Sequence, residues 1–337
     1  MQNAIFILGE AWGAEELKQQ TPFVGPSGYE LTRLLADAGI NRADCYLTNV
    51  LNLHPPGSDL DSLCGSKLDG VVGYPAIKPA KYLRAEFQPE LERLGDELLE
   101  VDPNIILCLG NTALWAMAGK TAISQQRGTT QLSTHTANGF KILATYHPAA
   151  VLRDRPLRPV VVADFGKALR ESTFPDLRRP YREIWIEPDL QDCRDFFEKH
   201  LPKTSLLSVD IETSGRRITC IGFAPNSRTA LVIPFVDKRK LAGNYWATGE
   251  LECEVWRLIA GVLENPIPKL FQNGLYDISF LYRSYGIKVA GATHDTMLLH
   301  HALQPESKKD LGFLGATYAD FGAWKQMRVK KTTKRED

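Results

Sequence analysis

The sequence predicts an α/β protein of two domains: a parallel sheet with helices on both faces, followed by a mixed sheet backed by helices. Three observations support this. The chain has 337 residues, about twice the length of a typical domain. The first half alternates short apolar runs with helical patterns, which is typical of a parallel sheet. The second half places its strand patterns first and most of its helical patterns later, which indicates a mixed sheet.

In the first half, short apolar runs predict buried strands at 4–8, 45–51, 105–109 and 141–145. Periodic apolar positions between or after them predict helices at 28–38, 86–99, 112–118 and 160–171. Because each strand is followed by a helical segment, helices are expected on both faces of the sheet. The first domain should therefore have three layers.

A linker is expected at 172–182, where the sequence is STFPDLRRPYR. Two prolines and little periodicity make this segment a poor helix or strand. We therefore expect a first domain over 1–172, a linker over 173–182 and a second domain over 183–337.

In the second half, strand patterns precede most of the helical ones. Strands are expected at 183–186, 205–209, 218–224 and 230–235, with a helix starting near Pro188. Helical patterns follow at 250–264, 275–285, 296–303 and 311–318. A mixed sheet covered by helices is the expected result.

Composition excludes several classes of protein. Hydrophobic residues make up 44% and charged residues 24%, which is typical of a globular chain and not of a fibre or a disordered one. No apolar run approaches the roughly 18 residues of a membrane span, and the N-terminus has no positive charge of the kind a secretory signal carries. We expect a cytoplasmic protein with no membrane partner. The 40 basic and 40 acidic residues cancel, so global charge does not indicate nucleic-acid binding.

Four polar motifs of the first half follow or close predicted strands. They are GEAWG at 9–13, TPFVGPSG at 21–28, TNV at 48–50 and YHPAA at 146–150. Ligands of open α/β sheets bind where parallel strands end, so an aromatic ring, an amide and an imidazole should surround one opening. Two plainer interpretations stay open: the first motif is a glycine turn, and His147 is a structural residue of its own turn.

In this order, GEAWG, PFVGPSGYEL, CYLTNV and YHPAAVLR resemble the uracil-DNA glycosylase superfamily over residues 1 to about 172. The resemblance implies a flipped uracil in the opening. Phe23 would stack on its ring, Asn49 would pair with its edge and His147 would stabilise charge on the leaving base. Val151, Leu152 and Arg153 would wedge into the duplex and contact phosphate.

Two departures from the superfamily bear on activity. Where active branches carry an Asp or a similar group that positions water, this chain has Ala11, and Glu10 is the acidic residue beside it. The iron–sulfur branches carry a CxxC pair and two later cysteines. The six cysteines here include no CxxC, so Cys64 and Cys108 have no pair to join and no iron–sulfur cluster, zinc site or disulfide framework is expected.

A second group of acidic residues begins with Asp210 and Glu212 in SVDIET. On a strand, positions two apart point the same way, so the two carboxylates should converge. Close carboxylates repel unless a cation lies between them, and Mg²⁺ or Mn²⁺ prefers oxygen ligands. For this tripeptide alone, a solvated strand end is the better interpretation.

SVDIET, NGLYDISFL and HDTMLLHHAL followed by KKDLGFL resemble the 3'-5' exonuclease domain of family A DNA polymerases, of the DEDD superfamily, over residues about 181–337. The resemblance implies a ribonuclease H-like domain. Asp210, Glu212 and Asp277 would hold Mg²⁺ or Mn²⁺, and Asn273 would lie near the substrate strand. Asp295 would be a supporting position or a helix N-cap.

The third motif of that family, a Tyr or His followed by an Asp, is expected beyond LGFLGATYADFGAWK. Tyr318-Ala319-Asp320 has the wrong spacing, and the remaining tail has neither Tyr nor His. We therefore expect an exonuclease domain truncated at its C-terminus. The arrangement is one associated with bacteriophage polymerases, which implies a downstream polymerase domain of the same polypeptide and, for a phage protein, the cytoplasm of a bacterial host.

Three functional hypotheses remain open. The first is a replication and repair fragment that excises uracil and proofreads DNA, either single-stranded or as a primer-template. The second is a non-catalytic uracil reader attached to a polymerase exonuclease, which Ala11 favours. The third, a free-standing repair enzyme, requires a complete exonuclease site.

Overall fold

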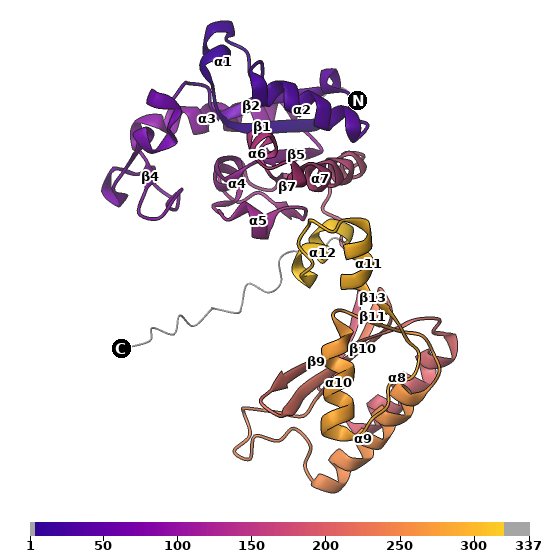
Figure 1. The fold of residues 1–337 in the computed structure, drawn as a ribbon. Helices are drawn as coiled ribbons and strands as arrows, with labels where there is room; N and C mark the ends of the chain where they lie inside the picture. Colours follow the sequence, from indigo (N-terminus) through magenta and orange to yellow (C-terminus); the bar gives the residue numbers. More distant parts are fainter. Residues whose placement is uncertain (1–3, 320–337) are drawn as a thin grey trace, which may run out of the picture. The chain divides into compact units, whose positions relative to one another are not determined.

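The computed structural model describes residues 4–319. These residues fall into two compact units, one of 4–178 with 306–319 and one of Arg179–Pro305. The first unit contains a five-stranded sheet and the second a six-stranded sheet (Figure 1). The predicted α/β class is confirmed.

The sheet of the first unit has the strand order β2-β1-β5-β7-β6. Its strands are β1 (Ile5–Ala11), β2 (Cys45–Leu51), β5 (Ile105–Leu109), β6 (Thr130–Leu132) and β7 (Lys141–Thr145). The four predicted strands are parallel to one another, whereas β6 pairs antiparallel to β7 at the edge. Parallel pairing brings the carboxyl ends of β1, β2, β5 and β7 to one edge of the sheet.

Helices cover both faces of this sheet, as predicted. They are α2 (Pro26–Asp37) and α7 (Arg158–Glu171) on one face and α3 (Gln88–Val101) and α4 (Asn111–Ala118) on the other. Alternate residues of β1 divide between the two cores: Ile7 packs with α2 and α7, and Phe6 with α3 and α4. This alternation is the period of two of a strand buried on both faces.

Short elements were not predicted, because they are too brief to show a period. They are α1 (Ala14–Gln19), α5 (Ile123–Gln126), α6 (Pro148–Arg153), β3 (Cys64–Gly65) and β4 (Tyr82–Leu83). Short 3₁₀ turns lie at Arg42–Asp44, Pro56–Ser58, Leu60–Leu63, Lys67–Asp69, Ala85–Phe87, Arg155–Leu157 and Leu201–Lys203.

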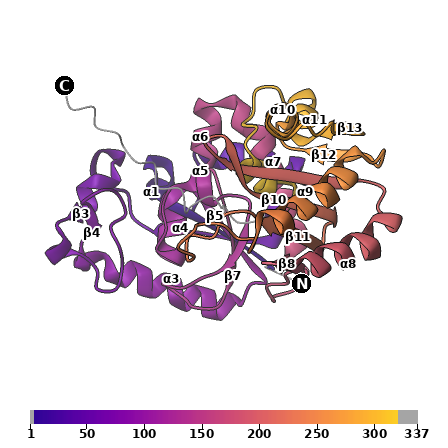
Figure 2. The same cartoon turned by 90° about the horizontal axis from the view of Figure 1, so that it is seen from below.

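The strands β3 and β4 belong to a lobe, residues 52–87, that projects from the first sheet (Figures 1 and 2). Apolar packing holds the lobe in place. The indole of Trp115 donates a hydrogen bond to the carbonyl of Pro75 (2.8 Å), and its ring centroid lies 5.0 Å from that of Tyr74. Leu60, Leu63 and other lobe residues join the core beneath α3 and α4.

The sheet of the second unit is mixed, as predicted. Its strands are β8 (Glu183–Ile186), β9 (Leu207–Ser214), β10 (Arg217–Asn226), β11 (Thr229–Pro234), β12 (Lys269–Phe271) and β13 (Ala292–Asp295), in the order β13-β12-β9-β10-β11-β8. Strand β10 runs antiparallel to β9 and β11, and the other pairs are parallel. Strands β12 and β13 were not predicted, since each has only three or four residues.

Two helices of the second unit, α8 (Leu190–His200) and α9 (Gly249–Glu264), lie side by side (Figure 2). Their apolar residues share one core with Val209 and Ile211 of β9. Two further helices, α10 (Gly274–Tyr285) and α11 (Thr296–Leu303), each follow a short strand. Alternate residues of β9 therefore face away from the α8 and α9 core.

The expected second domain of 183–337 differs from the structure at its C-terminal end. Helix α12 (Leu311–Tyr318) belongs to the first unit, where Phe313 and Leu314 pack against Val160. The buried ammonium of Lys167 donates hydrogen bonds to the carbonyls of Ala316 (2.8 Å) and Ala319 (3.0 Å). The last carbonyls of a helix have no partner within it, so a buried lysine there stabilises this packing.

The segment expected to be a linker has two parts. Residues 172–178 lie against the first unit, because buried Lys141 donates hydrogen bonds to the carbonyls of Phe174 (2.6 Å) and Asp176 (3.1 Å). The guanidinium of Arg178 lies 3.9 Å from the centroid of the Phe174 ring. The chain that follows is exposed up to Tyr181, which keeps 83% of its accessible surface.

Limited trypsin digestion of the chain should first cut after Arg178 or Arg182, because proteases act on exposed backbone that makes few contacts. Mass spectrometry of the fragments identifies the bond. Replacing Lys141 with Met removes the hydrogen bonds that hold 172–178 and should add early cuts after Arg170. A first cut within residues 100–160 would contradict the proposed domain boundary.

The cysteines and the membrane prediction can be compared with the described residues. All six cysteines are free thiols. Between residues 4 and 319, no helix has both the length and the apolar character needed to cross a bilayer.

Candidate functional site

The first unit has a cavity of about 180 Å³ at the carboxyl edge of its sheet. Its volume is that of several water molecules. Four predicted site residues line it, namely Glu10, Phe23, Asn49 and His147. Further lining residues are Ala11, Trp12, Gly13, Glu16, Ser27, Pro55 and Ser58. The structure therefore brings together the ends of β1, β2 and β7 with the loop before α2.

Phe23 is held in a left-handed backbone conformation, with φ of 58°, which costs energy for a residue with a side chain. The guanidinium of Arg42 donates hydrogen bonds to the carbonyls of Phe23 (2.9 Å) and Gly28 (3.1 Å). Gly28 has to be glycine, because a Cβ there would lie 1.8 Å from the carbonyl oxygen of Phe23. The buried ring is thus positioned by its backbone.

Asn49 lies in the last half of β2 beside Gly9 of β1, its partner in the parallel register. A Cβ on Gly9 would lie 2.2 Å from Oδ1 of Asn49 and 2.5 Å from the Phe23 ring, so glycine allows these two side chains to approach. The Arg93 guanidinium donates to the backbone carbonyl of Asn49 (2.9 Å). Asn49 keeps 2% of its accessible surface, and its carboxamide offers both a donor and an acceptor to the cavity.

His147 is the N-cap of α6, where its Nδ1 accepts a hydrogen bond from the backbone N–H of Ala149 (3.2 Å). An accepting Nδ1 carries no proton, so in the neutral ring the proton is on Nε2. Burial lowers the pKa of His147, while the nearby Glu10 carboxylate opposes this. Burial and the cap thus favour a neutral imidazole with an Nε2–H donor.

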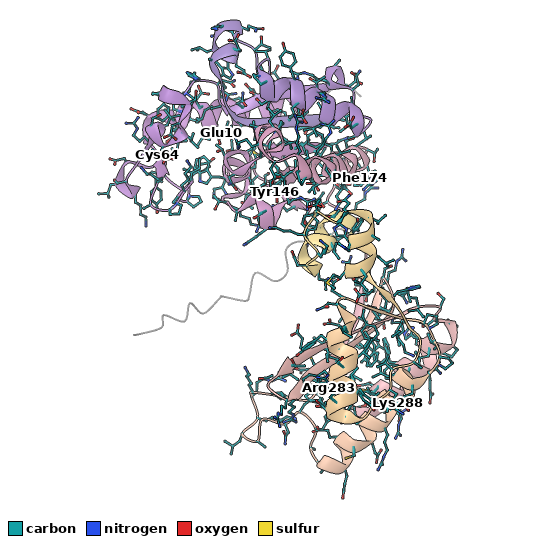
Figure 3. The ribbon with its side chains drawn as sticks, viewed as in Figure 1. Glu10, Cys64, Tyr146, Phe174, Arg283 and Lys288 are labelled. Atoms are coloured by element: carbon teal, nitrogen blue, oxygen red, sulfur yellow. The ribbon has the colours of Figure 1, made fainter. Side chains whose placement is uncertain are left out.

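Glu10 follows Gly9 on β1 and is exposed (Figure 3). Its Oε2 accepts a hydrogen bond of 2.5 Å from the hydroxyl of Thr112 in α4. Sequence reasoning did not identify Thr112, since the two residues are 102 positions apart.

Glu16 is a second residue that sequence reasoning missed. It is buried, and its two oxygens accept hydrogen bonds from the N–H groups of Gly13 (3.1 Å) and Gly25 (3.0 Å). It therefore ties the loop after β1 to the loop before α2. A Glu three positions after a helix N-cap is the capping-box spacing, and that signal could have found it.

Leu152 and Arg153 lie on α6, the helix that His147 caps, and do not line the cavity. Leu152 keeps 37% of its accessible surface, and Arg153 is exposed. Both are thus available to a molecule that approaches α6. Val151 is not, because it is fully buried in the core beneath α2 and α7, so its expected contact with the duplex was wrong.

In the second unit, Asp210 and Glu212 lie on the same face of β9, opposite the Ile211 side that joins the core. Their register partners on β10 are Gly222 and Cys220. Asp210 is exposed, whereas Glu212 is half-buried. The alternation predicted from D-x-E is thus present.

Asp277 lies in the first turn of α10 and keeps 5% of its accessible surface. Its Oδ1 accepts a hydrogen bond from the N–H of Ile211 (3.0 Å), between the two β9 carboxylates. Burial, together with repulsion from Asp210, raises the pKa of Asp277 to about 6. Within residues 4–319, however, no three His, Cys, Asp or Glu side chains are grouped closely enough to hold a metal ion.

Asp295 connects the start of α10 to the start of α11. Its carboxylate caps α11 through the N–H of Met297 (2.8 Å) and also accepts from the N–H groups of Asn273 (3.1 Å) and Gly274 (2.7 Å). Asn273 is exposed and left-handed, with φ of 58°. The structure thus gives Asp295 the helix-capping role that sequence analysis left open.

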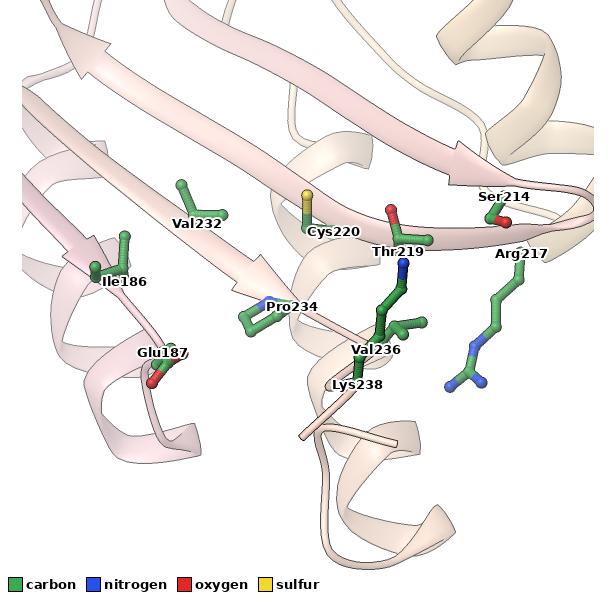
Figure 4. Close-up of a pocket in the computed structure, with 10 residues that line it drawn as sticks. All are labelled: Ile186, Glu187, Ser214, Arg217, Thr219, Cys220, Val232, Pro234, Val236 and Lys238. Carbon is green, nitrogen blue, oxygen red and sulfur yellow. The ribbon is translucent and has the colours of Figure 1, made fainter. Parts of the chain in front are cut away.

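A cavity of about 590 Å³ lies on the second sheet, where side chains of neighbouring strands point into it (Figure 4). Ser214 lines this cavity and lies two positions after Glu212 on β9. Because positions two apart on a strand share a face, the cavity lies on the same face of the sheet as the β9 carboxylates. Its wall includes apolar Val232 and the cations Arg217 and Lys238. The third exonuclease motif was expected beyond residues 311–325, which lies outside the described residues.

The cysteines of the first unit do not fit an iron–sulfur cluster. Cys108 is fully buried in the apolar core, where burial raises the pKa of its thiol. Cys64 lies in the projecting lobe, and its thiol donates to the carbonyl of Leu60 (3.4 Å) (Figure 3). Cluster ligands are thiolates gathered around one centre, and these thiols are not grouped with other ligands in the part of the chain that the structure describes.

Two family models match the chain, one in each half. Residues 2–178 match the family model described as the uracil DNA glycosylase superfamily. Residues 186–336 match the model described as 3'-5' exonuclease. The chain therefore belongs to the uracil DNA glycosylase superfamily, and in it a glycosylase-superfamily domain is fused to a 3'-5' exonuclease domain.

Relatives cover each part of the chain. The Type-4 uracil-DNA glycosylase of Archaeoglobus fulgidus is 33% identical over 172 residues, 48% of this chain and 74% of the relative. That of Thermotoga maritima is 30% identical over 177 residues, 50% of this chain and 77% of the relative. The DNA polymerase of Bacillus phage SP01 is 23% identical over 261 residues, 68% of this chain and 27% of the polymerase. These similarities support hydrolase activity on DNA.

Two solved structures are similar to part of the chain. One is Brucella melitensis NrnC, with 16% identity and a TM-score of 0.29 over 42% of this chain and 63% of that one. The other is the EXD2 exonuclease domain soaked in Mg and GMP, with 16% identity and a TM-score of 0.27 over 36% of this chain and 59% of that one. This chain spans less than two thirds of either.

Proposed function

We propose that the first unit removes uracil from DNA. The observation that carries this proposal is the single cavity lined by Phe23, Asn49, His147 and Glu10. A buried aromatic face favours stacking of a flipped base, and a carboxamide can pair with the adjacent N–H and C=O of a uracil edge.

His147 would act as a neutral donor to the leaving base. In hydrolysis, the bond between C1' of the sugar and N1 of uracil breaks, and its electron pair leaves with the base. A donor that is already oriented lowers the energy of the negative charge that develops on the uracil oxygen. The cap at Nδ1 supports this role, because it orients the ring and leaves Nε2–H for the substrate.

Glu10 would act on the attacking water. The water oxygen forms the new bond to C1', and one water proton passes to the carboxylate and then to solvent. A negative charge beside the sugar also favours the positive charge that develops on its ring. The position of Glu10 in the cavity wall supports this role.

A uracil reader without turnover is the second candidate, and Ala11 favours it, since this position carries no water-positioning group. The two candidates differ in product. Abasic sites formed in uracil-containing single-stranded DNA would support excision. Binding of that DNA without abasic sites would support the reader.

Replacing Asn49 with Asp should weaken binding of uracil-containing single-stranded DNA by about 1–3 kcal/mol, the scale of one bidentate base contact. The carboxylate keeps the shape of the side chain but loses its N–H donor. Fluorescence anisotropy with uracil and thymine strands measures the effect. Asn138→Asp makes the same charge change at an exposed turn and serves as the control. An unchanged preference for uracil would remove Asn49 from the site.

We propose that the second unit is a divalent-metal exonuclease that removes nucleotides from the 3' end of DNA. The donor chemistry supports it: Asp210, Glu212 and Asp277 offer only oxygen ligands, which Mg²⁺ and Mn²⁺ prefer. A bound cation would have to draw these three side chains closer together than they lie in the described structure. A bound cation would neutralise the repulsion between the carboxylates and polarise the phosphate that is attacked. Asn273 and the cations of the adjacent cavity would contact the substrate strand.

Similarity to the phage polymerase supports a further part of the proposal. It suggests that the chain works beside a polymerase domain of the same polypeptide, on primer-template DNA. A phage protein of this kind would act in the cytoplasm of its bacterial host.

A further inference from the structure

We propose that Thr112 is a positioning residue of the first unit, which holds the Glu10 carboxylate toward the water that attacks the sugar. The inference rests on the proposed uracil excision and adds a residue to its site. Thr112 does not line the cavity, so it acts through Glu10.

The contact joins two neighbouring strands at the catalytic edge. Glu10 lies near the end of β1, and Thr112 lies just after β5, which is paired to β1 in parallel register. The Thr112 hydroxyl donates to Oε2 of Glu10 at 2.5 Å. Hydrogen bonds to a charged acceptor are shorter and stronger than neutral ones. Glu10 itself is exposed, so without this contact water would compete for its carboxylate.

The backbone around Thr112 is shaped to make the contact. Gly110 turns the chain from β5 into α4 with φ of 90°, a conformation that favours glycine. A Cβ at Gly110 would lie 3.3 Å from Cβ of His147, so the turn passes close to the histidine of the site. Thr112 follows in the first turn of α4 and keeps 2% of its accessible surface. A buried β-branched side chain has little rotational freedom, and its hydroxyl therefore has a defined direction.

The two oxygens of the Glu10 carboxylate have different roles. Oε2 is occupied by Thr112. Within residues 4–319, Oε1 makes no hydrogen bond to the protein, which leaves it for the substrate side. Because one oxygen of the carboxylate is already held, the side chain loses less conformational freedom when its other oxygen orients the water. This preorganisation lowers the activation barrier of excision without changing how tightly uracil binds.

The test is the excision rate of three variants of the full chain on uracil-containing single-stranded DNA. Thr112→Val keeps the shape and removes the donor, and we expect kcat to fall by about ten- to a hundredfold with KM nearly unchanged. Thr112→Ser keeps the donor and should restore most of the rate. Thr130→Val, at a buried threonine of β6 outside the site, is the matched control.

A double-mutant cycle with Glu10→Gln separates positioning from a general packing effect. If Thr112 acts through Glu10, adding Thr112→Val to Glu10→Gln should lower kcat much less than it does in the wild-type chain. Equal losses in both backgrounds, or a rise in KM alone, would overturn the inference. Full activity of Thr112→Val would also overturn it and leave the proposed function standing. A wild-type chain that excises no uracil would overturn both.

Discussion

Replacing His147 with Leu is expected to slow uracil excision by about 10²–10³-fold, the usual cost of removing one donor that stabilises negative charge in a transition state. The substitution removes Nε2–H from the cavity and the cap of α6. Losing an N-cap costs about 1 kcal/mol of stability, too little to unfold the unit, so the loss should lie mainly in kcat. Single-turnover cleavage of a labelled uracil strand measures it.

The pH dependence should identify the active form of the ring. Burial lowers the pKa of His147 below the ordinary value, which is about 6.5. The neutral ring should thus persist as pH falls from 8 to 6.5, and the excision rate should stay level over that range. Below it, protonation places a hydrogen on Nδ1 and breaks the bond with Ala149. Because the folded-state pKa is the lower one, stability is also lost as pH falls below about 6.5.

The control for this experiment is His301→Gln, at an exposed histidine of the second unit. It should leave the excision rate and its pH profile unchanged. Two outcomes would contradict the neutral-donor role: a His147→Leu chain as active as the wild type, or a wild-type rate that rises as pH falls through 6.5.

Mn²⁺ is expected to stabilise the second unit of the wild-type chain and not that of an Asp210→Ala variant. A ligand present at a hundred times its Kd contributes about 2.7 kcal/mol by mass action, or roughly 10–20 °C in the melting temperature of a small unit. The Asp210→Ala variant keeps two of the three carboxylates. These two bind a cation weakly, and they repel each other less when no cation is present. Scanning calorimetry with and without Mn²⁺ measures both effects.

The matched control is Asp195→Ala, which removes an exposed carboxylate from α8. It should respond to Mn²⁺ as the wild type does. The transition of the first unit should not move in either variant, since none of the proposed ligands lies there. Equal stabilisation of the wild-type and Asp210→Ala chains by Mn²⁺ would show that the proposed ligand set is wrong.

Much of the fold followed from short-range patterns. Mostly apolar runs of five to seven residues predicted β1, β2, β5 and β7, because a strand buried on both faces is apolar along most of its length. The D-x-E spacing predicted that Asp210 and Glu212 share a face, because side chains alternate along any strand. Strands β12 and β13 escaped prediction, since three or four residues contain too little pattern.

Part of the candidate glycosylase site was also predicted from the pattern of strands. Parallel strands end at one edge, so motifs that follow them meet there, and Asn49 and His147 line the cavity as expected. Thr112, Glu16 and Arg42 were not predicted. The partners of Thr112 and Arg42 lie far away in the sequence, and Arg42 lies 19 positions after Phe23, whose carbonyl it holds. Nothing in the local sequence of Arg42 indicates that acceptor.

The sequence by itself determined the longer strands and helices, the two sheets and several of the residues that can do chemistry at their edges. These depend on the period of side chains along an element, which neighbouring residues set. Only the tertiary structure decided that the His147 proton belongs on Nε2, that Thr112 holds Glu10 and that α12 packs on the first unit. Such features depend on burial and on hydrogen-bond partners far away in the chain, and packing alone brings those groups together.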